Sequence, residues 1–134
     1  MSELAKTDEK KNLVGLFHGK DMADQMPAPY ERDIFLFDTR VAGTMYNDDI
    51  RESAAKLQAG SRLNFFREPG NVYDDLAIVI KTLDGHKIGY VPRKDNPVFA
   101  RLMDAGKELF GQVKRILDNE YYINIEIEIY LHED

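Results

Sequence analysis

The chain has 134 residues, of which 43% are apolar, and a formal net charge of −6 at pH 7. This length is enough for one domain with its own hydrophobic core. The sequence contains no cysteine, which excludes disulfides, thiolate metal sites and cysteine nucleophiles. No apolar run reaches the length of a membrane span, and the charged amino terminus lacks the apolar core of a signal peptide. We therefore expect a cytoplasmic protein with no membrane partner.

Residues 1–32 are predicted to be an extension that precedes the domain. Met1–Lys11 is polar and charged, which predicts a disordered start. The apolar patch Leu13–Phe17 predicts one or two helical turns, and the string Pro27–Pro29 predicts a linker. The short helix is expected to pack on the domain or on a second subunit, and docking to a partner protein is the alternative.

The domain itself is predicted over residues 33–131. Its first strand is expected at Ile34–Ala42, with Gly43 ending it. Apolar residues at helical spacing follow the acidic pair Asp48–Asp49, so a short helix is predicted with both acids at the positive end of its dipole. Alternating apolar residues then predict a strand over Ser61–Arg67.

The second half of the domain is predicted to contain a hairpin, a helix and two longer strands. Ala77–Leu83 and Lys87–Val91 should pair around an Asp-Gly turn. Asn96, followed by proline, predicts a capped helix that ends at a later glycine. The strands are expected at Leu109–Leu117 and Tyr121–Leu131, and the last one alternates isoleucine with polar residues at a strict period of two.

These elements amount to about six strands and two or three short helices. The predicted fold class is mostly β, a small OB-like or SH3-like antiparallel β-barrel. Residues 132–134 are expected to be a tail.

The acidic charge is unevenly distributed along the chain. Arg62–Arg115 contains 10 Lys and Arg against 7 Asp and Glu, whereas the rest of the chain contains 8 against 17. Phosphate contacts normally supply most of the affinity for nucleic acids, so the net charge argues against a broad grip on duplex DNA. It does not exclude a small pocket for the end of one strand.

The strings richest in turn formers and aromatic side chains stand next to the predicted strands. They are Arg67–Asp74 (REPGNVYD), Ala77–Ile78 and Gly89–Arg93 (GYVPR), with Val41–Gly43 and Tyr46 upstream. In this order they resemble the HIRAN domain, and the resemblance covers Asp33 to Leu131.

The resemblance implies a small β-barrel related to the OB fold, found alone in bacteria and attached to SNF2-type DNA translocases in eukaryotes. It also implies binding of single-stranded DNA at a free 3′-hydroxyl end. On this ground we expect a module that serves DNA repair or the processing of stalled forks, with a helicase, translocase or nuclease acting in trans. A barrel that binds another protein and no nucleic acid is the alternative.

Tyr46, Tyr73 and Asp74 are the central candidates for binding. The resemblance implies that the two rings sandwich the terminal nucleotide, and a tyrosine face offers about 1–3 kcal/mol of stacking per base. A carboxylate beside them can accept a hydrogen bond from a terminal hydroxyl and would repel a phosphate in the same place. The alternative is that Asp74 caps backbone amides within its turn.

Four further residues complete the predicted nucleic-acid-binding set. Arg93, with Lys94 next to it, matches the basic position that contacts backbone phosphate in the family, although a solvated pair of charges is an equal reading. Tyr90 could stack on a base or pack in the domain. Asn71 could contact phosphate or sugar, but asparagine is more often a turn former.

The chain departs from the family pattern at three positions. Met45 stands where the best-known eukaryotic members have arginine, and Asn47 stands where an aromatic residue is common. Leu76 replaces a frequent asparagine. These departures remove a cation, a ring and a polar contact, so they bear on affinity more than on fold.

We expect no enzymatic activity, no bound metal and no cofactor. The 3 histidines lack ligand spacing, and no serine has the context of a nucleophile. Asp74 and Asp75 are adjacent, so in an extended stretch they point to opposite sides and do not form an acid–base pair. An accessory role in a nuclease or other hydrolase is the weaker alternative.

Overall fold

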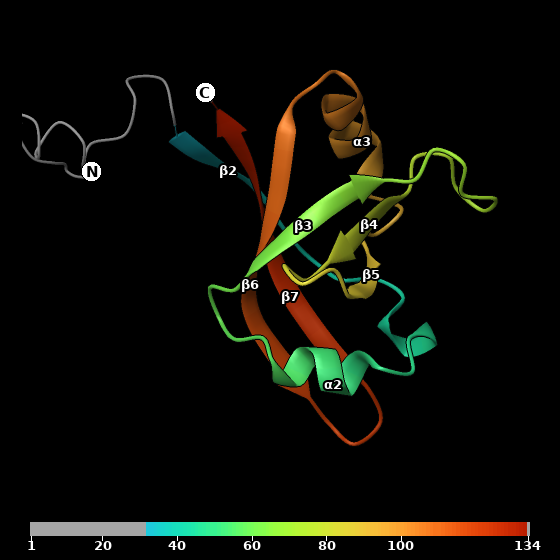
Figure 1. Ribbon diagram of the computed structural model, residues 1–134, viewed down its shortest axis with the longest axis vertical. Helices are drawn as coiled ribbons and strands as arrows, with labels where there is room; N and C mark the ends of the chain where they lie inside the picture. Colours follow the sequence, from blue (N-terminus) through green and yellow to red (C-terminus); the bar gives the residue numbers. More distant parts are fainter. Residues whose placement is uncertain (1–31, 134) are drawn as a thin grey trace, which may run out of the picture. The chain divides into compact units, whose positions relative to one another are not determined.

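The computed structural model describes residues 32–133, so the predicted disordered start, short helix and linker lie outside the described residues. Six strands form one antiparallel sheet in the order β2-β7-β6-β3-β4-β5 (Figure 1). The elements are β2 (Arg32–Arg40), η1 (Thr44–Tyr46), α2 (Ile50–Ala55), β3 (Arg62–Arg67), β4 (Ile78–Lys81), β5 (Lys87–Tyr90), α3 (Asn96–Asp104), β6 (Glu108–Asp118) and β7 (Ile123–Glu133).

The long β6–β7 hairpin forms the centre of the sheet. In β7 the isoleucines at 123, 125, 127 and 129 are buried, and the residues between them are partly exposed. This confirms the predicted period of two, which follows because alternate side chains of a strand point to opposite faces. The strand begins at Ile123 rather than Tyr121, because Asn119 Oδ1 accepts hydrogen bonds from the backbone amides of Tyr121 and Tyr122 and holds them in the turn.

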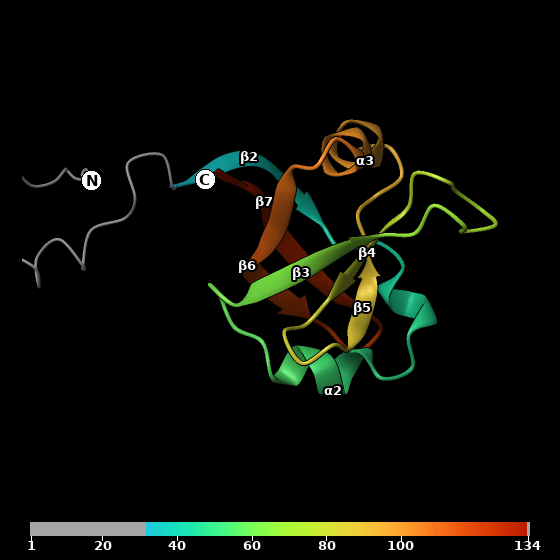
Figure 2. The same ribbon diagram turned by 45° about the horizontal axis from the view of Figure 1, so that its top comes forward.

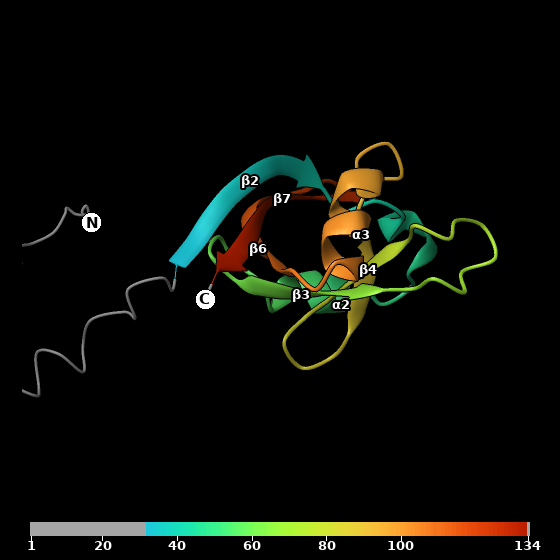
Figure 3. The same cartoon turned by 90° about the horizontal axis from the view of Figure 1, so that it is seen from above.

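The predicted barrel is only partly right. The strands are antiparallel and the sheet is strongly curled, as Figure 3 shows from above, but its hydrogen-bonded ladder does not close into a barrel. The chain just beyond β2 meets the other edge, β5, at one isolated pair. Ala42 N donates to Tyr90 O at 2.7 Å, and Tyr90 N donates to Ala42 O at 2.9 Å.

Gly89 permits this close meeting of the two edges. A Cβ built on Gly89 would collide with the carbonyl oxygen of Ala42 and with the Val41 side chain. Only a residue without a side chain lets the backbones approach this closely. The glycine therefore decides how near the segment after β2 lies to β5.

The helices lie at opposite ends of the sheet, α3 beside the upper part of β6 and α2 near the β6–β7 turn (Figures 1 and 2). The predicted cap of α3 was wrong by one residue. Asp95 occupies the N-cap position without a side-chain cap bond, and Asn96 is the first helical residue. Its side chain is buried, only 2% of the residue being exposed, because its amide is used in a hydrogen bond to another loop. None of the helices in residues 32–133 has the length and apolar character needed to cross a bilayer.

Candidate nucleic-acid interface

The loop between β3 and β4 is folded around Asn71. Asn71 Oδ1 accepts hydrogen bonds from the backbone amides of Tyr73 (2.9 Å) and Asp74 (3.2 Å). Its Nδ2 donates to Glu68 Oε1 at 3.1 Å, and Ala77 N closes the turn by donating to Asp74 O at 3.1 Å. Both ends of the Asn71 side chain are therefore engaged in forming the turn, the alternative that the sequence left open.

Arg67 stabilises the same loop by hydrogen bonds to its backbone, a role that was not predicted from the sequence. Its guanidinium donates to the carbonyls of Ala77 (2.7 Å) and Asp75 (3.0 Å) and forms a two-pronged pair with Asp104 at the end of α3 (2.9 and 3.2 Å). Only 13% of the Arg67 side chain is exposed. A planar guanidinium can make these contacts at once. The loop is thereby tied to the end of β3, which carries Arg67, and to α3.

Asp74 is held by donors on both carboxylate oxygens. Oδ1 accepts from Leu76 N at 2.9 Å, and Oδ2 accepts from Asn96 Nδ2 at 2.8 Å with Arg93 Nε at 3.9 Å. The Asn96 hydrogen bond, followed by the Leu76 amide and the charge of Arg93, holds the pKa of Asp74 below its ordinary value, against the opposing effect of burial. The side chain is 18% exposed, so it presents a fixed negative charge close to the surface.

Tyr73 and Tyr46 are displayed to solvent on separate segments. Tyr73 in the loop is 84% exposed and Tyr46 at the end of η1 is 85% exposed. The loop and η1 protrude from the same side of the sheet in Figures 1, 2 and 3. The aromatic ring pairs found in the described part of the chain do not include a contact between Tyr46 and Tyr73.

The η1 turn that carries Tyr46 is anchored by polar bonds to two strands. The buried Thr44 hydroxyl donates to Ile123 O at 3.1 Å, and Asn47 Nδ2 donates to Lys87 O at 2.7 Å. Asn47, one of the departures from the family pattern, thus fixes the turn to β5. Met45, the residue before Tyr46 and another of the departures, is an apolar residue that is 76% exposed.

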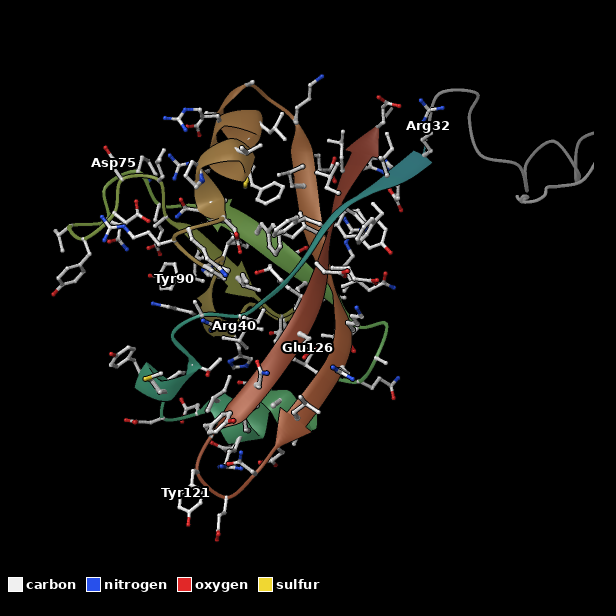
Figure 4. The ribbon with its side chains drawn as sticks, turned by 180° about the vertical axis from the view of Figure 1, so that it is seen from behind. Arg32, Arg40, Asp75, Tyr90, Tyr121 and Glu126 are labelled. Atoms are coloured by element: carbon white, nitrogen blue, oxygen red, sulfur yellow. The ribbon has the colours of Figure 1, made fainter. Side chains whose placement is uncertain are left out.

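Tyr90 links the loop to the segment that leads into η1. Its backbone pairs with Ala42, and its hydroxyl donates to Glu68 Oε1 at 2.8 Å while accepting from Lys87 Nζ at 3.0 Å. Hydrogen bonds from Asn71 and Tyr90 hold the pKa of Glu68 below its ordinary value. Figure 4 shows Tyr90 between the loop that bears Asp75 and the end of β2 at Arg40. Its hydroxyl is thereby used in positioning the loop.

The basic residues predicted for the site follow β5. Arg93 is exposed over 76% of its side chain, with its long contact to Asp74. Lys94 is exposed and has no hydrogen bond or ion pair with any described residue. The structure thus brings Tyr73, Asp74 and Arg93 together and adds Asn96, which the sequence had placed only as a helix cap.

No group of three or more potential metal ligands of the His, Cys, Asp or Glu type is gathered within residues 32–133. The exposed residues of this surface offer stacking on the tyrosines, hydrogen bonding to Asp74 and charge neutralisation by Arg93 and Lys94.

Comparisons with known protein families and solved structures both point to one family. The family model described as HIRAN domain matches residues 34–132. A crystal structure of a protein from Lactobacillus plantarum is 36% identical with a TM-score of 0.71, covering 78% of this chain and 99% of that one.

Two structures of the HIRAN domain of human HLTF share the fold. The crystal structure superposes with a TM-score of 0.58 and the NMR structure with 0.52; each is 17% identical and covers 76% of this chain and 80% of the other. A search of curated proteins found no match to this sequence. On the family match over 34–132 and the similarity to the Lactobacillus plantarum protein, this chain belongs to the HIRAN domain family.

Proposed function

We propose that this HIRAN domain binds nucleic acid and recognises the 3′-hydroxyl end of single-stranded DNA. The last base stacks between Tyr46 and Tyr73, and Asp74 accepts the hydrogen bond of the terminal hydroxyl. Arg93 and Lys94 neutralise neighbouring phosphates. Membership in the HIRAN domain family supports the nucleic-acid part of this proposal, because binding of DNA is what that family implies.

The arrangement around Asp74 carries the proposal. An ionised carboxylate offers about four lone-pair positions for hydrogen bonds. Leu76 N and Asn96 Nδ2 occupy two of them, and Arg93 approaches a third without reaching hydrogen-bond distance. Tyr73, the residue before Asp74, is almost fully exposed and so offers a face for stacking close to this carboxylate in the chain.

The same charge provides the selectivity. A terminal hydroxyl can donate to the carboxylate, and a charged acceptor makes such a bond roughly twice as strong as a neutral one. A terminal phosphate, or the phosphate of an internal nucleotide, would bring a second negative charge to that position. Because the pKa of Asp74 is already low, protonation would not relieve the repulsion near neutral pH.

Fluorescence anisotropy with two short oligonucleotides of one sequence, ending in a 3′-hydroxyl or a 3′-phosphate, tests the mechanism. The hydroxyl-ended strand should bind more tightly, and Asp74→Asn should reduce this preference while keeping the shape of the side chain. Equal binding of both strands by the wild-type chain would show that the carboxylate does not read the end. If neither strand binds, a protein-interaction module becomes the better account.

The wider role follows from the same proposal. The chain has no enzymatic activity of its own and acts in the cytoplasm, in DNA repair or in the processing of stalled forks. A helicase, translocase or nuclease acts with it in trans.

A further inference from the structure

A concave surface of the described chain lies next to the segment 93–96. It is a groove of about 320 Å³ bounded by the end of β2, the residues before α3 and the β6–β7 hairpin. Phe37, which is 40% exposed, contributes an aromatic wall, and Arg40, Lys94 and Lys114 contribute cations. No residue of the proposed end-binding site other than Lys94 lines this groove.

Within residues 32–133, the acidic side chains of the groove all have partners, whereas two of its cationic side chains have none. Asp38 pairs with Lys114 at 3.6 Å, and Asp95 Oδ2 accepts a hydrogen bond from the Thr39 hydroxyl at 2.8 Å. Glu126 is likewise paired, with Arg115 at 2.6 Å. Arg40 and Lys94 are exposed, and neither has a hydrogen bond or ion pair with another residue in the described part of the chain.

The groove and Asp74 share one short wall. Arg93 and Asn96 contact Asp74, while the two residues between them, Lys94 and Asp95, line the groove. Successive Cα atoms are about 3.8 Å apart, so the basic edge of the groove lies on the order of 10 Å from the Asp74 site. Figure 4 views the molecule from this side, with Arg40 and Glu126 labelled.

We infer that the groove binds the single strand on the 5′ side of its terminal nucleotide. Arg40 and Lys94 neutralise successive backbone phosphates there, and Phe37 offers an apolar surface to a base. Single-strand sites commonly combine a basic groove with an aromatic face in this way. The direction of the bound strand rests on the proposed function, because the 3′ end has to lie at Asp74 for the preceding nucleotides to enter the groove.

The inference is tested by comparing wild type with Arg40→Ala in the binding of short and longer single strands at several salt concentrations. A dinucleotide occupies only the end site, whereas an oligonucleotide of about eight residues also reaches the groove. Arg40→Ala should weaken the longer strand about fivefold at 0.1 M salt and lower its salt slope by about 0.7, the contribution of one phosphate contact on a single strand. It should leave dinucleotide affinity unchanged.

Lys107→Ala is the matched control, because Lys107 is an exposed cation that lines neither the end site nor the groove. Lys107→Ala removes the same charge. It should change neither the salt slope of the affinity nor the difference in affinity between the dinucleotide and the longer strand. If Arg40→Ala weakens both lengths equally, or has no more effect than Lys107→Ala, the groove assignment is wrong.

A 3′-phosphorylated version of the longer strand separates this inference from the proposed function. Should hydroxyl and phosphate ends bind equally while Arg40→Ala still lowers the salt slope of the longer strand, the end-recognition mechanism fails and the groove stands. If the hydroxyl end is clearly preferred and Arg40→Ala has no effect, end recognition stands and the groove assignment fails.

Discussion

Asn96, the first residue of α3, donates its side-chain amide to Asp74 Oδ2 at 2.8 Å across a separation of 22 residues in sequence. The amide is buried, and its oxygen, Oδ1, has no hydrogen-bond partner among residues 32–133. A buried acceptor left unpaired costs about 1–3 kcal/mol. The orientation is nevertheless fixed, because turning the amide would place its oxygen against the carboxylate. Asn96 is thus a positioning residue that holds Asp74 in one rotamer and ionised.

Replacing this amide should alter both stability and DNA binding. Asn96→Ala removes a hydrogen bond to a charged group, worth about 1.5–3 kcal/mol, although it also removes the unpaired oxygen. We expect a lower free energy of unfolding in urea and weaker binding of a hydroxyl-ended strand. A double-mutant cycle with Asp74→Asn should give a coupling energy of about 0.5–3 kcal/mol. Purely additive effects would show that the contact is not energetically coupled.

The stability of the wild-type chain should depend on acid pH through the same pair. Because the pKa of Asp74 is lowered in the folded state, its contribution is present above the unfolded value and is lost as pH falls through the folded one. The urea midpoint should therefore fall between about pH 5 and pH 2. Asn96→Ala should flatten this fall, since it removes the largest cause of the shift. An unchanged pH profile in the variant would contradict the assignment.

Tyr73 should contribute to binding and not to folding. The residue is 84% exposed, so Tyr73→Ala should leave the thermal unfolding temperature nearly unchanged. Loss of one stacking surface should weaken the affinity for a short single strand by about 1–3 kcal/mol. Tyr73→Phe retains the aromatic face and should bind almost as the wild type does. If the phenylalanine variant is as weak as the alanine variant, the hydroxyl rather than the ring is what matters.

Gly89→Ala should separate the two edges of the sheet. The new methyl group would meet the Ala42 carbonyl, so the bridge to Tyr90 should loosen and stability should fall by about 1–3 kcal/mol. Amide hydrogen exchange at Ala42 and Tyr90, whose amides form that bridge, should become faster. Gly70→Ala provides the comparison, because a Cβ there meets no atom within 4 Å. Equal exchange in both variants would argue against a role for the close approach.

Arg67→Lys should test whether the hydrogen bonds that hold the β3–β4 loop require the planar guanidinium group or only a positive charge. Lysine keeps the positive charge but cannot serve Asp104 and two carbonyls at once. We expect lower thermal stability and weaker DNA binding, since the loop that carries Tyr73 and Asp74 would be held less firmly. Arg51→Lys, at a more exposed pair with Asp118, should change the unfolding temperature less. A variant at 67 that matches wild type in both measurements would rule out this requirement.

Local pattern was sufficient to predict most of the elements, and the resemblance of several separate strings to one family predicted the family. Side-chain periodicity in β7 depends only on neighbours along the chain, and so does the turn at Gly85, where φ is 91°. The turn-forming character of Asn71 likewise belongs to one continuous string, Arg67–Asp74. These features follow from steric preferences of a few adjacent residues, which are visible in a single sequence.

Contacts between distant segments were decided only by the tertiary structure. Whether the sheet closes depends on how two edges meet at Ala42 and Tyr90, and no local pattern encodes that distance. Asn96 has the sequence signature of a helix cap, yet its amide holds Asp74, because a buried polar group takes the partner that the fold brings within reach. The groove between Arg40 and Lys94 likewise arises from residues far apart in the chain. Sequence thus determined which chemical groups are present and which strands carry them, while packing determined which of those groups face one another.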